Sequence, residues 1–481
     1  MAQGRNSVWL LGDQAKARIS FSDTSYNITS ETRTIPFSDT QGNISDENGN
    51  LLMSSNGVFI ADATGDTMMN GGGLNPGWGV INCPDGLCMS FANLFLPVPG
   101  DSTIYILFHQ VAEITAPVGL DALEIYYSII DISQNGGLGK VVSKNNVALS
   151  GVFSWGYAAC KHANGRDWWI TAMNDVANGL HTFLLTPDTL KYMGLQTFPI
   201  QNYPYGFAGQ PLFSPDGTKF AFGGSYGING MNYLSSITLL NFDRCDGTFS
   251  LDTVIDFTDN YISFASAFSP NSKYLYFSSL VHAYQYDTDA GGLLPHELIA
   301  TLDTFYSPTP PFSVSFYLMY LAANGRIYLT SGNSVMDLHE IESPDSSGVT
   351  CNFNLHNVNI PCFNFRSVPN HPNYYLGRLV GSPCDTLTSI NDPPEHDFRF
   401  KVFPNPVMDG NFNILYLLPQ NQPGKLEVFD INGRRIYEMN LPHWSTMQEV
   451  SLPKSISSGV YNCVITSGGE RGSKKVVVYR E

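Results

Sequence analysis

The sequence predicts an all-β protein, in which a seven-bladed β-propeller is followed by a small Ig-like antiparallel β-sandwich. Three observations lead to this prediction. A strand–turn–strand pattern recurs along most of the chain, no apolar stripe of helical period and length stands out, and aromatic residues reach 13% of a chain that is only 14% charged. Many aromatic and few charged residues favour strands with packed faces.

The repeat is clearest at residues 213–224, where Pro215-Asp216-Gly217 supplies a tight turn before a β-prone run. Residues 268–277 repeat it closely, and five looser copies follow the same plan. The predicted blade turns are Gly49, Gly100, Gly165, Gly217, Ser272, Gly325 and Pro372, which stand 47 to 65 residues apart. Repeats of about 50 residues with one turn each predict one propeller blade per copy.

Such blades bury both faces only by closing into a ring. The last predicted turn is followed by a single strand-like run, residues 374–379, whereas residues 5–22 contain two such runs. We therefore expect the ring to close through strands shared between the two ends of residues 1–384, because a shared blade removes exposed strand edges.

A second domain follows the propeller. Residues 385–398 are polar and contain two adjacent prolines, which predicts an exposed linker. Residues 399–481 then alternate short β-prone runs with turns, and Asn432-Gly433 is a strong hairpin signal. The pattern predicts a small antiparallel β-sandwich.

The net charge of −17 is unevenly distributed, with −20 on residues 1–398 and +3 on residues 399–481. An acidic body repels phosphate backbones, which argues against a nucleic-acid partner. No run of about 18 apolar residues is present that could span a bilayer, and no apolar signal core follows the N-terminus. Because the chain passes from Met1-Ala2-Gln3 straight into β-prone sequence, we expect a targeting segment to have been removed already.

Four motifs follow one another in the C-terminal region, at residues 402–406, 428–435, 452–461 and 474–478. On these motifs, residues 399–481 resemble the sorting domain carried by cargo of the type IX secretion system of Bacteroidota. The sorting-signal residues that the resemblance implies are Pro404, Asn405, Pro406, Gly433, Gly459, Tyr461, Lys474, Lys475 and Val476. It also implies export across the outer membrane, with the translocon and its shuttle proteins as partners. Cleavage and release, or attachment to surface lipopolysaccharide, usually follows in that family.

Residues 1–384 resemble the propeller region at the start of many large secreted surface proteins from the same bacteria. The resemblance is carried by stretches such as residues 9–13, 45–52, 131–139 and 161–169. It implies an architecture and a location at the cell surface, and it implies no activity.

The eight cysteines indicate an oxidising compartment outside the cytoplasm. Cys83 and Cys88 flank a Pro-Asp-Gly turn, which predicts a local disulfide, since a zinc site would need a second pair of ligands at short spacing. Cys351, Cys362 and Cys384 are close enough in sequence to staple the closing blade. Cys463 alternates with apolar neighbours, so we expect a buried free thiol there.

Several short patterns suggest chemistry that their context disfavours. Residues 223–227 satisfy G-x-S-x-G, but no helix follows as a serine hydrolase requires. His162 precedes a blade turn and is expected to bond to backbone. Residues 46–50 and 287–292 space oxygen ligands as calcium loops do, yet they lack a distal glutamate and fit Asx turns better. We expect no cofactor or metal, with calcium as the secondary alternative.

Aromatic residues offer stacking platforms for sugar rings, although the adjacent Trp168 and Trp169 are expected to pack between blades. We therefore favour a secreted or surface-displayed, non-catalytic protein that binds a glycan, another protein or copies of itself. The alternative is a hydrolase or lyase acting on extracellular polysaccharide or protein, with carboxylates at the mouth of the central channel. A third hypothesis is that the protein is a structural subunit of a surface filament.

Overall fold

The computed structural model describes residues 4–13, 16–22, 24–115, 119–200, 207–229, 232–259, 263–290, 296–308, 311–385, 400–416, 418, 422–442, 447–468 and 470–480. The chain forms two compact units. The larger one holds Ala2–His162 and Arg166–Tyr375, and the smaller one holds Leu376–Glu481 together with Met1 and the short segment Ala163–Gly165. Apart from Asp385, the predicted linker 385–398 lies outside the described residues.

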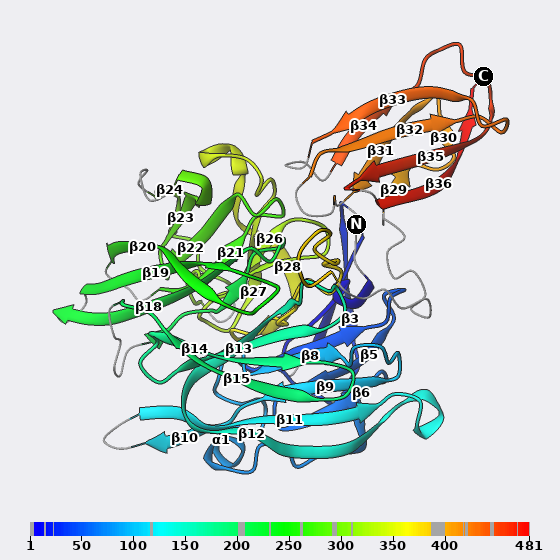
Figure 1. Ribbon diagram of the computed structural model, residues 1–481. Coiled ribbons are helices and arrows are strands. Elements are labelled where there is room, and N and C mark those ends of the chain that lie inside the picture. The colour runs from blue at the N-terminus through cyan, green and yellow to red at the C-terminus, as the bar shows by residue number, and fades with distance from the viewer. Residues whose placement is uncertain are drawn as a thin grey trace. The chain divides into compact units, whose positions relative to one another are not determined.

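In the described part of the larger unit, the strands form five hydrogen-bonded sheets (Figure 1). The twelve-stranded sheet of residues 42–197 divides into three successive antiparallel groups, which a single parallel pair, Met69 with Lys140, and the long strand at 140–161 connect, so seven groups follow one another as blades. Blade 1 contains β1 (Val8–Leu11), β2 (Lys16–Phe21) and β3 (Tyr26–Glu31), and blade 2 contains β4 (Gly42–Ser45), β5 (Leu51–Ser55), β6 (Phe59–Asp62) and β7 (Thr67–Gly72). Blade 3 contains β8 (Asn93–Pro97), β9 (Ile104–His109), β10 (Ala112–Thr115), β11 (Gly119–Asp131) and the first part of β12 (Lys140–Lys161).

The second part of β12 begins blade 4, which continues with β13 (Trp168–Asn174), β14 (Gly179–Leu185) and β15 (Leu190–Thr197). Blade 5 contains β16 (Phe207–Ala208), β17 (Leu212–Phe213), β18 (Lys219–Asn229), β19 (Asn232–Phe242) and β20 (Phe249–Asp259). Blade 6 contains β21 (Ser263–Phe268), β22 (Tyr274–Ser279), β23 (His282–Asp287) and β24 (Glu297–Thr301), and blade 7 contains β25 (Met319–Leu321), β26 (Ile327–Leu329), β27 (Val335–Ile341) and β28 (Phe353–Asn364).

Helical structure is confined to short connecting elements in the described residues. They are α1 (Trp78–Asn82), η1 (Gly4–Asn6), η2 (Asn135–Gly137), η3 (Thr288–Ala290) and η4 (Gly348–Cys351). The protein is therefore all-β, as the sequence predicts.

Contacts between the blades arrange them as a ring. The innermost strands touch in the order β1, β4, β8, β12, β17, β21 and β25. Blade 7 then meets blade 1, because Trp9 of β1 packs against Tyr328 of β26 with ring centroids 5.8 Å apart. Aromatic residues fill the spaces between blades, and Trp168 and Trp169 are both buried there. Together these contacts make the seven-bladed propeller.

Six of the seven predicted blade turns join the innermost strand of a blade to the strand that follows it. Their residues Gly49, Gly100, Gly165, Gly217, Ser272 and Gly325 all have left-handed φ angles, between 63° and 88°. Glycine adopts this region without steric cost, which explains its use at five of the six positions.

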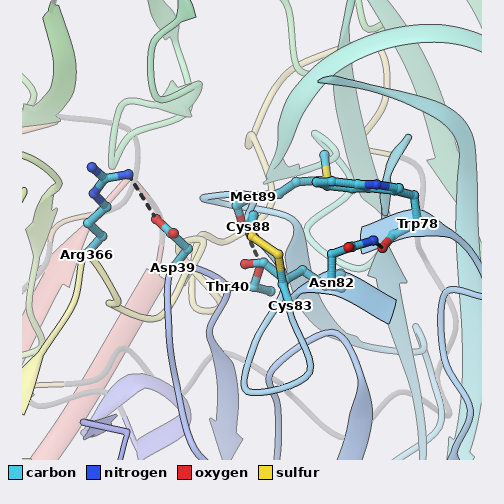
Figure 2. The surroundings of a disulfide bond; sticks show 9 residues. Asp39, Thr40, Trp78, Asn82, Cys83, Cys88, Met89 and Arg366 are labelled. Carbon is cyan, nitrogen blue, oxygen red and sulfur yellow. Dashed lines mark hydrogen bonds and ion pairs between the residues drawn. A yellow bond between two sulfur atoms is a disulfide. The ribbon is translucent and has the colours of Figure 1, made fainter. Parts of the chain in front are cut away.

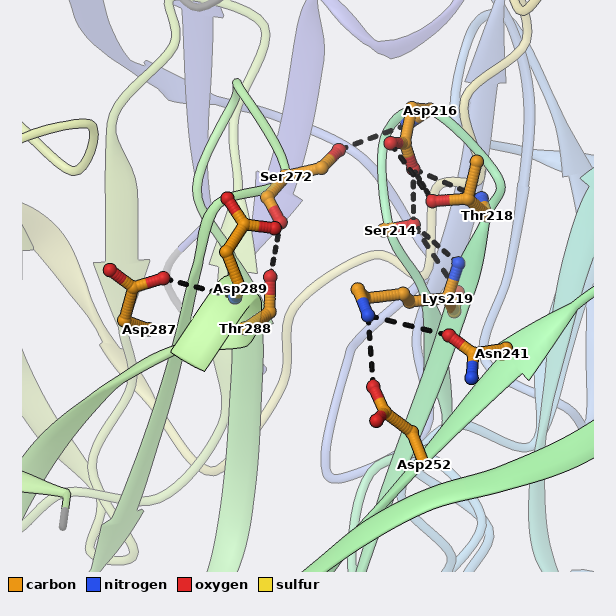
Figure 3. Close-up of polar contacts among 10 residues, drawn as sticks. All are labelled: Ser214, Asp216, Thr218, Lys219, Asn241, Asp252, Ser272, Asp287, Thr288 and Asp289. Carbon is orange, nitrogen blue, oxygen red and sulfur yellow. Dashed lines mark hydrogen bonds and ion pairs between the residues drawn. The ribbon is translucent and has the colours of Figure 1, made fainter. Parts of the chain in front are cut away.

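Side chains fix the shape of these turns and join neighbouring ones. In the blade 5 turn the Ser214 hydroxyl donates to Asp216, and the Lys219 amide donates back to Ser214 Oγ at 2.9 Å. The Asp216 amide then donates to Ser272 Oγ of the blade 6 turn, at 3.1 Å. Figure 3 shows this link between the two turns. The same sequence feature therefore sets a hairpin and registers one blade on the next.

The prediction for Pro372 is wrong, because this residue lies in no strand and joins none. The hairpin of blade 1 instead turns at the N-terminal end of the chain, next to Gly12 with φ of 90°. Residues 365–375, here called the return segment, run opposite to β1: the Gly12 amide bonds to Asn364 Oδ1, and the Arg5 amide bonds to the Tyr375 hydroxyl. Pro369 and Pro372 have no N–H to donate, which opposes a regular ladder there.

Ring closure therefore differs in form from the expected shared blade. Within the described residues, β1, β2 and β3 make a sheet of their own. The return segment adds packing beside it, since Val368 joins Trp9 and Leu11 in one buried cluster. Side chains and one isolated main-chain bridge, between Ser38 and Phe365, hold the two ends of the ring together in place of a common strand ladder.

The cysteines are only partly as predicted. Cys83 and Cys88 form a disulfide with Cα atoms 6.0 Å apart, beside Thr40 (Figure 2). Cys351 and Cys362 are buried free thiols, so they do not staple the closing blade. Cys351 of η4 and Cys362 of β28 are buried in two different apolar clusters. Cys384 is in disulfide form, as is Cys245, and Cys463 is the buried free thiol that the sequence predicts.

The smaller unit is a β-sandwich (Figure 1). One sheet contains β29 (Phe400–Phe403), β31 (Asn411–Tyr416) and β34 (Met447–Ser451), and the other contains β30 (Val407–Met408), β36 (Glu470–Tyr479), β35 (Gly459–Ser467), β32 (Gly424–Phe429) and β33 (Arg435–Leu441). Their inner faces share one apolar core that includes Phe400, Ile414, Val428, Cys463 and Val476. The pairing is antiparallel except between β30 and β36.

Replacing Gly325 by alanine tests the blade-turn argument. We expect Gly325→Ala to lower the free energy of unfolding by about 1–2 kcal/mol, because φ of 78° is unfavourable for a residue with a Cβ. Chemical denaturation of the full chain measures this. Gly72→Ala is the control, since its Cβ meets nothing within 4 Å. Equal stability of the two variants would contradict the argument.

Candidate functional site

The return segment occupies the centre of the ring. The Asn370 side chain donates to Tyr157 O of β12 at 2.8 Å, and the Tyr374 hydroxyl donates to Phe95 O of β8 at 2.9 Å. His371 Nε2 bonds to Asn43 O of β4 at 2.7 Å, and the Asn373 side chain bonds to Pro215 O in the blade 5 turn at 2.7 Å. These partners belong to four different blades, so the segment must cross the space that the innermost strands surround.

Burial keeps residues 370–374 of the return segment uncharged. It lowers the pKa of His371 to about 4, so the imidazole is uncharged at neutral pH. Its Nε2 then carries the proton, because the partner is a carbonyl oxygen. Tyr374 packs edge-on against Trp168, with ring centroids 5.9 Å apart. The segment therefore brings hydrogen-bonded and aromatic side chains into the interior of the ring.

Four side chains meet at the end of the ring where the innermost strands begin, and we call them the entry cluster. Asp39 precedes β4, Ser90 precedes β8, Tyr317 precedes β25, and Arg366 belongs to the return segment. Arg366 Nη1 lies 4.0 Å from Asp39 Oδ1, a pair that is drawn in Figure 2. Ser90 Oγ lies 3.4 Å from the same carboxylate oxygen.

Aromatic rings hold the Arg366 side chain. Its guanidinium carbon lies 4.8 Å from the centroid of the Tyr317 ring and 4.5 Å from that of Phe365. Nε donates to Gly332 O at 3.1 Å, while 37% of the side chain stays exposed. The charge is thus positioned by neighbours and still reaches solvent.

The backbone of this region is unusual. Asp39, Phe91 and Arg366 all adopt left-handed φ angles, of 56°, 59° and 59°. Such angles cost free energy in residues other than glycine, and they gather at functional sites more often than elsewhere. The surrounding packing must therefore sustain three strained positions at one end of the ring.

Burial also changes the acidity of Asp39. It raises the pKa of this carboxyl to about 6, against the opposing effects of Arg366 and Ser90. The pKa of Tyr317 is raised by burial and then by the Asp39 charge. A buried acid with a raised pKa beside an exposed arginine makes the entry cluster the candidate functional site of the larger unit.

A second constellation has the outline of a hydrolase triad. His109 Nδ1 lies 2.7 Å from Asn75 Oδ1, and His109 Nε2 lies 2.8 Å from Ser128 Oγ. All three residues have no exposed surface, and burial lowers the pKa of His109 to about 3. Since substrate cannot reach Ser128, the arrangement is a buried network that joins β9, β11 and the loop before α1.

The other predicted chemistry is likewise used for structure. Ser225, from the G-x-S-x-G pattern, lies within β18 and bonds to Ser235 at 2.7 Å. His162 Nε2 bonds to Cys245 O at 2.9 Å. In the first candidate calcium loop, Asp46 accepts the amides of Asn48 and Asn50, as an Asx turn does. The second loop lies partly outside the described residues.

In the smaller unit, several sorting-signal residues build the sandwich. The Asn405 side chain accepts the Val477 amide at 2.9 Å and donates to Lys475 O at 3.0 Å, which ties it, between Pro404 and Pro406, to β36. Gly433 has φ of 78° in a turn capped by Asp430, and Val476 lies in the core. Gly459 pairs with Val478, and the Tyr461 hydroxyl bonds to Ser457 O. Lys474 and Lys475 are exposed.

A depression of about 550 Å³ lies among these motifs. It is lined by the turn at 430–436 and by residues 453–461. Ile431 is 84% exposed and the Arg434 side chain is 80% exposed, so both are available to a partner. Sequence motifs alone do not separate these exposed residues from the buried ones beside them.

Comparison with protein families identifies the kind of domain that the smaller unit forms. Residues 401–479 match the model of the secretion system C-terminal sorting domain. A domain of this kind is the type IX export signal, and it indicates delivery to the cell surface or secretion. No curated protein matches the chain in sequence. In the described residues, no helix is long and apolar enough to cross a membrane.

Several solved structures show weak overall similarity. A structural genomics protein of unknown function from Bacteroides thetaiotaomicron shares 12% identity, covering 80% of this chain and 97% of its own, with a TM-score of 0.27. A quinonprotein alcohol dehydrogenase-like protein from the same organism shares 12%, covering 77% and 78%, with a TM-score of 0.34. An α-L-arabinanase from Penicillium chrysogenum shares 9%, covering 74% and 94%, with a TM-score of 0.31. At these TM-scores none bears on the activity of this chain.

The acidity of Asp39 predicts how stability depends on pH. A folded-state pKa of about 6 exceeds the ordinary aspartate value of 3.8, so the folded state binds more protons between these values. Stability is then lost as pH rises through this window, by about 3 kcal/mol in all. We expect Asp39→Asn to match the wild type near pH 4 and to become more stable than it above pH 7, as measured by denaturant titration.

The control is Asp66→Asn, at an exposed carboxylate. We expect its stability difference from the wild type to stay constant across the same pH range. If the stability difference between Asp39→Asn and the wild type does not change with pH, the pKa of the Asp39 carboxyl is not raised in the folded protein.

Proposed function

We propose that this protein is a secreted or surface-displayed propeller that acts by binding and not by catalysis. Its residues 401–479 carry a type IX sorting domain, which supports the location. Its ligand is an extracellular glycan, another protein or a second copy of itself. The smaller unit engages the type IX machinery during export. The propeller surface then presents the binding sites.

One observation carries the non-catalytic proposal. The return segment crosses the centre of the ring, with hydrogen bonds from Asn370, His371, Asn373 and Tyr374 to four blades. A reaction site inside the ring would need space and convergent titratable groups. Here that space holds amides, a neutral imidazole and a phenol whose polar atoms bond to main-chain carbonyls. Binding on outer surfaces remains open to the molecule.

A hydrolase or lyase at the end of the channel is the competing function, and Asp39 favours it. An acid with a pKa of about 6 suits general acid catalysis near neutral pH. The inverting and retaining mechanisms both use two carboxyl groups on either side of the scissile bond. The charged group nearest Asp39 is Arg366, which favours holding an anion over cleaving a glycoside.

A combined binding and activity survey separates these functions. We expect the purified full chain to capture a ligand on a glycan array, in a pull-down with surface fractions, or by self-association. We also expect no release of reducing ends or peptides from extracellular polymers. Turnover that Asp39→Asn abolishes would establish the competing function, and absence of any ligand and of self-association would refute the proposed one.

The depression in the sorting domain predicts which substitutions block export. We expect Ile431→Asp to reduce the amount of protein in the medium or on the surface at least several-fold, with retention in the periplasm. The substitution places a charge on an exposed residue of the depression, so the fold should persist. Fractionation of a type IX-competent host followed by immunoblotting measures this.

The matched control is Met408→Asp, which changes an apolar residue that is 55% exposed outside the depression. It should leave export intact. Equal export of both variants and the wild type would exclude the depression as a recognition surface.

A further inference from the structure

The Arg366 guanidinium is held in place yet keeps donors available. Arg366 Nε donates a hydrogen bond to Gly332 O, and the guanidinium donates another to the Tyr317 hydroxyl. Among the described residues, the carboxylate nearest to it is Asp39, at 4.0 Å from Nη1, beyond hydrogen-bond range. Guanidinium has five N–H donors, so the exposed edge retains some for an outside acceptor.

This arrangement fits a planar anion. The guanidinium fork matches the two oxygens of a carboxylate, and such bidentate pairs are stronger than neutral hydrogen bonds. The flanking Tyr317 and Phe365 rings restrict the side chain before a ligand arrives, which reduces the entropy lost on binding. The body carries −20, so a singly charged group is repelled less than a phosphate dianion.

Asp39 lies where it competes with such a ligand. Its side chain is buried, and the groups that face it are Arg366 from the return segment, Ser90 before β8 and Tyr317 before β25. When ionised, Asp39 repels a second carboxylate. When protonated, it is neutral and its hydroxyl can donate a hydrogen bond.

We propose that the entry cluster binds the carboxylate of an extracellular ligand, with Arg366 as the bidentate anchor and Asp39 as a competing carboxylate that yields when protonated. The proposal deepens the binding function proposed above and rests on it. The same chemistry occurs in sugar acids and in simple hydroxy acids, and binding assays distinguish these two sources.

The burial of Asp39 sets the expected pH dependence. With a pKa of about 6, Asp39 is mostly protonated at pH 5 and mostly ionised at pH 7.5. If only the protonated form accepts the ligand, affinity should fall about 30-fold between these two values. The ligand carboxylate stays ionised throughout, so the change reports on the protein.

The test is calorimetric titration of the full chain with D-glucuronate, L-lactate, D-glucose and inorganic phosphate at pH 5 and pH 7.5. We expect both carboxylates to bind more tightly at pH 5 than at pH 7.5. Glucose should not bind comparably at either pH, and phosphate, which is largely a dianion at pH 7.5, should not bind comparably at that pH. Tighter binding of glucuronate than of lactate would identify a sugar acid, and equal binding would show that the carboxylate alone is recognised. Comparable binding of glucose at either pH, or of phosphate at pH 7.5, would overturn the proposal.

Three variants assign the roles. Arg366→Gln should lose carboxylate binding at both pH values, and Arg366→Lys, which keeps the charge without the fork, should retain only part of it. Asp39→Asn should bind at pH 7.5 as the wild type does at pH 5. Arg471→Gln, at an exposed position of the sorting domain, should change nothing. Thermal melts of each variant verify that it is folded.

Two outcomes would refute the assignment. One is carboxylate binding by folded Arg366→Gln that equals the wild type. The other is an unchanged pH dependence in Asp39→Asn. If no carboxylate binds the wild type at either pH, the entry cluster is not such a site. The array and pull-down survey would still decide independently whether the propeller is a binding protein.

Discussion

The hydrogen-bonded turn between the innermost strand of a blade and the strand that follows it is the constraint on which the propeller depends. A blade alone leaves two apolar faces exposed, so it is stable only between neighbours. The Ser214–Asp216–Lys219 turn fixes one hairpin from within, and its link to Ser272 sets the next blade beside it. Local chemistry thereby supplies a long-range arrangement. The entry cluster inherits its geometry from this ring, because its members come from the segments that precede β4, β8 and β25 and from the return segment.

Turns were predictable from the sequence because their signals are local. Proline, asparagine and glycine at fixed offsets report a backbone angle that a few neighbouring residues determine. Pro372 has the same local signature, and it misled because its neighbours His371 and Asn373 bond to Asn43 and Pro215, which are remote in sequence. Which segment enters the ring depends on the packing of all seven blades, and no short pattern carries that information.

The entry cluster was not predictable for a related reason. Asp39, Ser90, Tyr317 and Arg366 are far apart in sequence, and each is unremarkable in its own neighbourhood. The pKa of Asp39 is raised by burial, a property of the assembled ring. In the sorting domain the motifs could be recognised from the sequence, but they contain both residues that build the sandwich and residues that face solvent. Asn405 and Val476 build the sandwich, whereas Ile431 and Arg434 face outward, and only the fold separates them.

The position of the return segment also sets the order in which the parts of the propeller can complete their folding. The residues that fill the ring are the last of the propeller to leave the ribosome, while the strand they lie along is among the first. Blades 1 to 7 can form hairpins as they emerge, but the interior cannot be sealed until residue 375 is available. A chain cut short of this point would keep every blade and still expose main-chain carbonyls of β4, β8 and β12 to water. Completion of the fold is thus a check that the whole propeller has been made.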